Sequence, residues 1–169
     1  MPNWCYNSVT ITIEDSAKAD EFENFLSGLH SNKDEDAIGL FEYFLPRPQE
    51  EDKNWYGWNI ENWGTKWDVH QRNWSRMGHI FELEFDTAWS PPIGVFEQIH
   101  QLEGFDVFAR YDEPGMCFVG EFSEGEDVSY TYDFDDENWR DYLPEHVIED
   151  FNLENMYEDY LEFVEDDAE

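Results

Sequence analysis

The sequence of 169 residues contains very few positive charges. Nine lysines and arginines stand against 42 aspartates and glutamates, which gives a formal net charge of −33. Proteins that bind DNA, RNA or anionic membranes need Lys and Arg to replace the counterions around the phosphates. The composition therefore argues against direct binding of nucleic acid or a membrane surface and predicts that any charged partner is basic. Adaptation to high salt or a need for solubility would also fit this charge.

Cysteines and long apolar runs are scarce too. Cys5 and Cys117 are the two cysteines, and their spacing predicts neither a disulfide framework nor a metal site. No apolar run approaches the roughly 18 residues of a membrane span, and the first residues lack a basic region followed by an apolar one. We therefore expect a cytoplasmic protein.

Motifs for catalysis or cofactor binding are weak. Five histidines are scattered without an HxxxH or HxH pair, and no Gly-rich phosphate loop or GxSxG elbow occurs. Cys5 could be a nucleophile, and Lys66 could bind a carboxylate or pair with Asp68, but a buried thiol and a structural ion pair explain these residues more simply. The acidic run at 133–137 lacks the pattern of a calcium loop. We expect no catalysis, no cofactor and no metal site.

Aromatic residues are abundant, at 18% of the chain. Each ring buries about 150 to 250 Å² when it packs, so an aromatic core is expected. Residues 31–65 form a Trp-rich insertion that we predict to be ordered and held by Trp55, Trp58 and Trp63. These rings could instead stack bases or sugars, but such grooves normally carry Lys and Arg for the phosphates, so core packing is favoured.

The hydrophobic periodicity predicts an α+β fold. Alternation over 5–13 indicates a strand, and a helix capped by Asp15 or Ser16 follows to about residue 30. A hairpin is predicted with arms at 66–73 and 79–87, followed by a helix that begins after Ser90.

Strands at 105–111 and 116–122 follow, and the alternating residues 128–134 extend the sheet or fold back on it. The order β-α-β-β-α-β is that of a ferredoxin-like antiparallel sheet with both helices on one face. We assign this domain, with its insertion, to residues 1–134.

The last 49 residues, 121–169, are the most acidic part of the chain, with twenty acids and one base, Arg140. Apolar residues recur at helical spacing beyond Pro144, which predicts one amphipathic helix or two short helices broken near Asn152. Residues 135–169 are thus expected to form an acidic helical extension packed on or beside the domain. Its acids fall mostly four residues apart and include Glu145, Glu149, Glu154, Glu158, Glu162 and Asp166, with Asp133, Asp135, Asp136 and Glu137 beside them.

Five strings in the chain are similar to those of a known family. MPNWCYN, LFEYFLPRP, NWGTKWD, FDTAWSPP and YDEPGMCFVGEF together resemble the YubB ferredoxin-like domain family, small proteins associated with bacteriophages, conjugative plasmids and other mobile elements. The likeness covers roughly residues 1–122. It implies a ferredoxin-like fold and an origin in a mobile element, and it supplies neither an activity nor catalytic residues.

The acidic surface leads to a functional hypothesis. A row of acids four residues apart repeats every 6 Å or so along a helix, a scale comparable to the phosphate charges of a nucleic acid. We hypothesise a non-catalytic inhibitor that mimics nucleic acid and blocks a basic host defence protein, such as a CRISPR effector, a restriction enzyme or a nuclease. The alternative is a protein-interaction module of a mobile element that does not mimic nucleic acid and binds through Trp55, Trp58 and Trp63.

Overall fold

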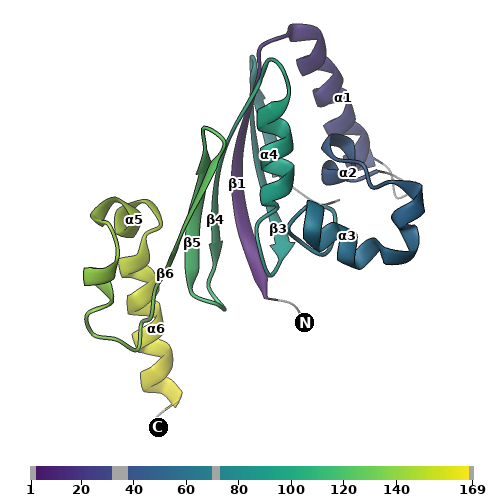
Figure 1. Ribbon diagram of the computed structural model, residues 1–169. Helices are drawn as coiled ribbons and strands as arrows, with labels where there is room; N and C mark the ends of the chain where they lie inside the picture. The colour runs from purple at the N-terminus through teal and green to yellow at the C-terminus, as the bar shows by residue number, and fades with distance from the viewer. Residues whose placement is uncertain (1–2, 32–37, 70–72, 168–169) are drawn as a thin grey trace.

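A computed structural model describes residues 3–31, 38–69 and 73–167, with the backbone alone described at 29–31 and 165–167. Six strands form one antiparallel sheet in the order β2-β3-β1-β4-β5-β6 (Figure 1). The strands are β1 Trp4–Ile13, β2 Asn73–Met77, β3 Ile80–Ala88, β4 Phe105–Glu113, β5 Phe118–Ser123 and β6 Glu126–Thr131. The helices are α1 Ser16–Ser31, α2 Leu40–Phe44, α3 Trp55–Asn62, α4 Ile93–Gln101, α5 Glu145–Asp150 and α6 Leu153–Asp167, with short 3-10 turns η1 Gln49–Asn54 and η2 Trp139–Tyr142.

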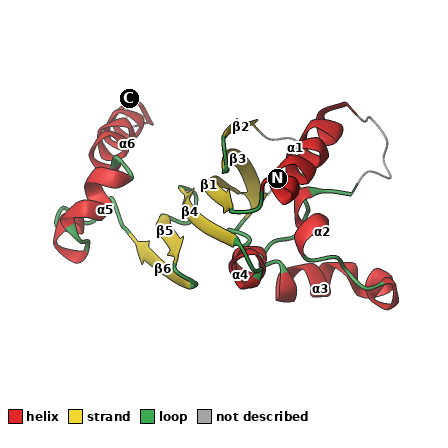
Figure 2. Ribbon diagram, turned by 90° about the horizontal axis from the view of Figure 1, so that it is seen from above, coloured by secondary structure: helices red, strands yellow, loops and turns green. Residues whose placement is uncertain are grey.

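The first four strands have the ferredoxin-like order. β1 lies between β3 and β4, while α1 follows β1 and α4 connects β3 to β4. Seen from above, α1 to α4 lie on one side of the sheet and α5 and α6 on the other (Figure 2). The predicted α+β fold is therefore confirmed, and β5 and β6 widen the sheet beyond it.

Local sequence signals explain these elements. In β1, Cys5, Asn7, Val9, Ile11 and Ile13 are buried, while the residues between them face the other side. Asp15 Oδ1 accepts a hydrogen bond from the backbone N–H of Lys18 at 2.9 Å, as the predicted N-cap of α1 should. This hydrogen bond holds the pKa of Asp15 below its usual value.

The main core lies between the sheet and α1 to α4 and is rich in aromatic rings. Phe22 of α1 meets Phe81 of β3 edge to face, with ring centroids 4.9 Å apart. Phe41 of α2 contacts Phe85 and Trp63 in the same geometry, at 5.8 Å each. Such contacts add directional preference to the burial of large apolar surfaces.

The insertion is held by two of the three predicted tryptophans. Trp63 is buried, its indole N–H donates to the carbonyl of Leu45 at 2.8 Å, and Trp58 packs edge to face against it. Trp55 is 38% exposed and contacts Tyr56, so its predicted anchoring role is wrong. Trp55 is the first residue of α3, and the buried residue of this helix is Asn59, one turn later.

The predicted first arm of the hairpin is misplaced. β2 begins at Asn73 and pairs Trp74 with Leu83, and the chain turns at Gly78 in the left-handed region at φ 64°. Residues 65–69 run beside the end of β3 without forming a strand, because Thr65 donates to the carbonyl of Ala88 and Val69 is buried in the core. Residues 70–72 of the predicted arm lie outside the described residues.

The residues 132–167, called here the C-terminal unit, pack on the opposite face of the sheet from α4. Their small core consists of Tyr132, Trp139, Leu143, Val147 and Leu153 around Val119 of β5. α5 and α6 are separate helices because Asn152 lies between them with φ 54°. No described helix is long and apolar enough to span a membrane.

Candidate interaction surface

The part of the sheet face opposite α1 and α4 that β3, β1 and β4 form is called here the open face; the C-terminal unit covers the same side of the sheet at β5. Along β3 the strand alternation turns Phe81, Leu83 and Phe85 into the core and leaves three exposed carboxylates, Glu82, Glu84 and Asp86, on the open face. Alternate residues of a strand lie about 6.8 Å apart, and neighbouring strands about 4.8 Å. The sheet therefore holds these carboxylates in a row of fixed spacing.

β4 adds Asp106 and Asp112 to the open face. The register places Tyr6 of β1 directly between Asp86 and Asp112. Burial, together with the neighbouring charge of Glu113, raises the pKa of Asp112 to about 6, and burial raises the pKa of Asp86. Asp112 is still predominantly ionised at neutral pH, so it adds to the negative charge of the open face.

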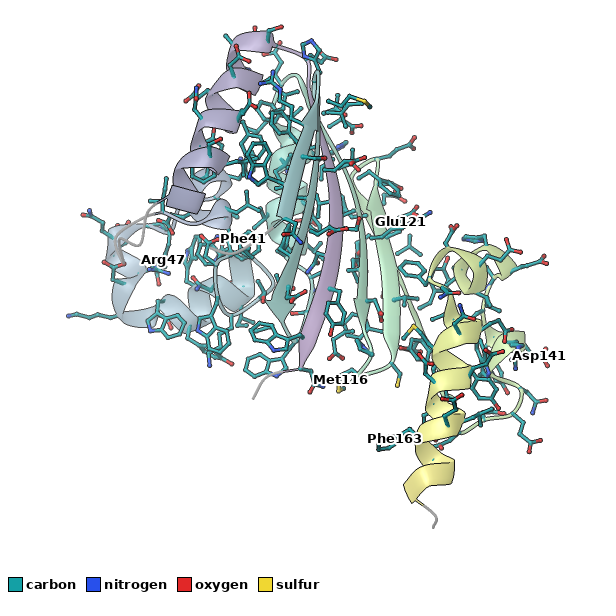
Figure 3. All side chains as sticks on the ribbon, turned by 180° about the vertical axis from the view of Figure 1, so that it is seen from behind. Phe41, Arg47, Met116, Glu121, Asp141 and Phe163 are labelled. Atoms are coloured by element: carbon teal, nitrogen blue, oxygen red, sulfur yellow. The ribbon has the colours of Figure 1, made fainter. Side chains whose placement is uncertain are left out.

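Arg110 is the only cation that the described strands place on this face. Its guanidinium donates to Asp150 of α5 at 2.8 Å and to Glu121 of β5 at 3.3 Å. Figure 3 shows Glu121 on the side of the sheet that faces the C-terminal unit, while Asp141 points away from the sheet. Arg76 of β2 lies toward α1, where it pairs with two acids of that helix. The open face thus keeps most of its negative charge.

The predicted acidic stripe is divided between α5 and α6, and one of its members is neutralised. Arg140 donates two hydrogen bonds to the carboxylate of Glu154, one from Nε to Oε1 at 2.6 Å and one from Nη2 to Oε2. This pairing lowers the pKa of Glu154. Glu154 is therefore a structural partner of Arg140 rather than a free charge, which corrects the expectation from its spacing.

Three of the acids at 133–137 organise their own loop. Asp133 accepts the backbone N–H of Asp135, and Asp136 accepts that of Asn138. Asp135 also accepts the hydroxyl of Tyr160 from α6, which raises the pKa of that tyrosine. Of the predicted acids, those that are exposed and have neither a described hydrogen-bond donor nor a described cationic partner are Glu137, Glu145, Glu149, Glu158 and Glu162. The side chain of Asp166 lies outside the described residues.

The strings that carry the family resemblance meet at one end of the sheet. Asn7 donates to the carbonyl of Cys5 and to the hydroxyl of Thr87, both at 2.9 Å. Thr87 in turn donates to the carbonyl of Ser90, and Ser90 to the carbonyl of Gly64. These strings therefore supply hydrogen bonds to one another's buried backbone, which is a structural reason for their occurring together.

A surface pocket opens where these strings meet. It has a volume of about 310 Å³ and is lined by Trp4, Trp67, Asp68, Val69, Asp86, Thr87 and Ala88. Trp4 and Trp67 are 44% and 40% exposed. Sequence reasoning missed both indoles, although the spacing of NWGTKWD places Trp67 beyond the end of α3.

The candidates for chemistry have structural roles. Burial raises the pKa of Cys5 to about 12, so its thiol is protonated and a poor nucleophile. Lys66 Nζ lies 4.3 Å from the ring centroid of Trp67. Asp68 accepts the backbone N–H groups of Phe41 and Glu42 at the start of α2. No group of three potential ligands in the described parts of the chain could hold a metal ion.

The fold and surface define an α+β protein of ferredoxin-like topology with an acidic sheet face. The family described as "ferredoxin-like domain in Api92-like protein" matches residues 62–155, and the chain belongs to this family. The crystal structure of protein api92 from Yersinia pseudotuberculosis is similar, with a TM-score of 0.56 and 11% identity over 79% of this chain and 99% of that chain. No curated protein matches the sequence.

The residues matched by the family differ from those that carry the sequence resemblance. They run from the end of α3 into α6, so they include the small core around Trp139 as well as β2 to β6. The sequence strings had pointed to residues 1–122 and left the acidic extension outside. At 11% identity, the likeness to the api92 structure bears on the fold alone.

Proposed function

We propose that this chain is a non-catalytic acidic inhibitor that occupies the cationic nucleic-acid-binding surface of a host defence protein. The observation that carries the proposal is the row Glu82, Glu84 and Asp86 on the open face, flanked by Asp106 and Asp112 and compensated on the described strands by Arg110 alone. The resemblance to the YubB family supports an origin in a phage or plasmid. The protein would then act in the cytoplasm of the bacterial host.

The physical basis is long-range attraction followed by fixed geometry. A net charge of −33 on 169 residues steers a basic partner toward the chain, and the attraction is screened over about 10 Å at 0.1 M salt. The hydrogen-bonded backbone fixes where these side chains leave the sheet, so less has to be ordered when they meet the partner's Lys and Arg. Binding through such a surface is fast and sensitive to salt.

We place the proposed contact on the sheet rather than on the helical stripe. Glu154 is paired with Arg140, and three acids at 133–137 accept hydrogen bonds within the C-terminal unit. Glu158 and Glu162 of α6 remain one turn apart and exposed. The proposed contact therefore consists of the open face, with these two acids as a second row.

The test is affinity capture from host lysate, followed by a competition assay with the captured protein. The proposal expects a DNA- or RNA-binding protein that this chain displaces from nucleic acid, with affinity falling steeply as salt increases. Recovery of partners that bind no nucleic acid, or a complex that is unchanged through a salt titration, would rule out mimicry.

A second candidate function rests on the exposed aromatic residues. Trp55, Tyr56 and Trp89 are 38%, 48% and 39% exposed, which is unusual for such large rings. They would form the contact of an interaction module that does not depend on charge. In that case a Trp55→Ala, Tyr56→Ala variant would lose the captured partner, and added salt would leave the complex intact.

A further inference from the structure

The pocket at the end of β3 combines two features that recognise cations. Trp4, Trp67 and Asp86 are among the residues that line it. Within the described parts of the chain, no side-chain hydrogen bond or ion pair involves the carboxylate of Asp86, and burial raises its pKa. A partly desolvated carboxylate beside aromatic faces gains more from an incoming cation than a carboxylate surrounded by water.

The neighbouring aromatic cluster already holds one cation of this chain. The ammonium of Lys66 lies 4.3 Å from the ring centroid of Trp67, 5.3 Å from that of Trp89 and 5.5 Å from that of Tyr56. Trp67 belongs both to this cluster and to the pocket wall. The rings at this end of the sheet are thus arranged in a way that accommodates positive charge.

The size of the pocket limits what can bind. Pockets for small molecules span about 300 to 1,000 Å³, and this one, at about 310 Å³, is at the lower limit. It fits one long side chain better than a cofactor. The guanidinium of arginine is planar, stacks on indole rings and donates two parallel hydrogen bonds to a carboxylate, whereas the ammonium of lysine acts as a point charge.

We propose that this pocket is an anchor site for an arginine side chain of the partner, with the guanidinium stacked on Trp4 or Trp67 and bonded to Asp86. This inference deepens the proposed function and rests on it for the identity of the partner as a basic protein. The open face supplies attraction over its whole area, and the pocket adds selection for one side chain at a defined place.

The test is an NMR titration that follows the indole N–H signals of Trp4 and Trp67. The probes are N-acetyl-arginine amide, N-acetyl-lysine amide and the neutral N-acetyl-norleucine amide, at 0.15 M salt. The matched variants are Asp86→Asn, which removes the pocket carboxylate, and Glu84→Gln, which removes the same charge from the same row outside the pocket. Trp4→Leu is a third variant, and the spectrum of each variant shows whether the sheet remains folded.

The proposal expects the arginine probe to shift both indole signals. The affinity of the arginine probe should fall at least fivefold in Asp86→Asn and in Trp4→Leu. In Glu84→Gln this affinity should change less than twofold. Equal losses in Asp86→Asn and Glu84→Gln, equal binding of the lysine probe, or shifts spread evenly over the acidic surface would each overturn it.

This outcome is separable from the proposed function. If the pocket fails the titration while Glu84→Gln and Asp86→Asn both weaken a salt-sensitive complex with a nucleic-acid-binding partner, the anchor is wrong and the mimicry stands. If the arginine probe binds as expected but no such partner is displaced from nucleic acid, the proposed function is wrong and the pocket stands.

Discussion

The main domain and the C-terminal unit both carry a net negative charge, but their hydrophobic cores differ greatly in size. The main core joins four strands and several helices around Phe22, Phe41 and Phe81, whereas the core of the C-terminal unit consists of five buried residues, Trp139 among them, packed on Val119 of β5. The C-terminal unit has the smaller core but the higher density of negative charge. Repulsion between these like charges opposes its folding. The comparison predicts that the two regions differ in stability and in their response to salt.

Phe81→Ala should have the largest effect on the main domain. The ring is fully buried and packs on Phe22, so its removal leaves a cavity in the core. We expect a loss of about 3–5 kcal/mol in the free energy of unfolding, measured by urea denaturation. A loss below about 1 kcal/mol would show that the main core is not continuous around this ring.

Trp139→Ala should disrupt the C-terminal unit and largely spare the sheet. The indole is buried and contacts Phe134 and Tyr157, and Arg140 lies over it. We expect amide exchange protection to be lost over 132–167 and kept over β1, β3 and β4, because a local unit can open without global unfolding. Loss of protection in β1 as well would mean that the two regions unfold together.

Sequence patterns predicted the strands of the sheet better than they predicted which surface charges are paired. The alternation in β1 and β3 and the cap at Asp15 depend on neighbours in the chain, so periodicity and local hydrogen bonding reveal them. The neutralisation of Glu154 by Arg140 depends on the break at Asn152, which turns α6 back toward η2. Helical spacing alone could not show this.

The pocket and the misplaced hairpin arm also could not be predicted from local sequence patterns. Trp67 and Asp68 follow the Trp-rich insertion at 31–65 and were predicted to lie in the first hairpin arm, at 66–73. In the structure Asp68 accepts hydrogen bonds at the start of α2, and Trp67 faces the end of β3. Those roles arise from segments 19 or more positions away, which single-sequence patterns do not encode.

Asp112→Asn should change the pH dependence of stability. The pKa of Asp112 is raised from 3.8 to about 6, so the folded protein binds this proton more tightly than the unfolded chain does. Its ionisation therefore destabilises the fold as pH rises from about 4 to about 6. The variant should melt at a higher temperature than the wild type at pH 7.5, and this advantage should disappear by pH 4.

Asp106→Asn is the matched control for this pH experiment. Asp106 lies on the same strand and face but is exposed, so its substitution removes the same charge without removing a buried one. If both variants shift the melting temperature equally at pH 7.5, general repulsion rather than the burial of Asp112 accounts for the effect.

Arg110→Gln should have the smallest effect on stability, and one that is sensitive to salt. The guanidinium is 37% exposed and joins the sheet to α5 through Glu121 and Asp150. Half-exposed pairs contribute little, so we expect a loss of about 0.5–1 kcal/mol, localised by faster amide exchange in α5. In 0.5 M salt the difference from the wild type should shrink, and a difference that grows with salt would contradict this account.

The central claim is that the open face, rather than the C-terminal helix, binds the basic partner. The most direct measurement compares two neutralised triples, Glu82→Gln, Glu84→Gln, Asp86→Asn and Glu158→Gln, Asp159→Asn, Glu162→Gln, in competition with nucleic acid for the captured protein. Each triple removes three exposed acids. We predict that the first triple loses at least tenfold in inhibition and the second less than threefold. Equal losses, or a greater loss from the second triple, would contradict the claim.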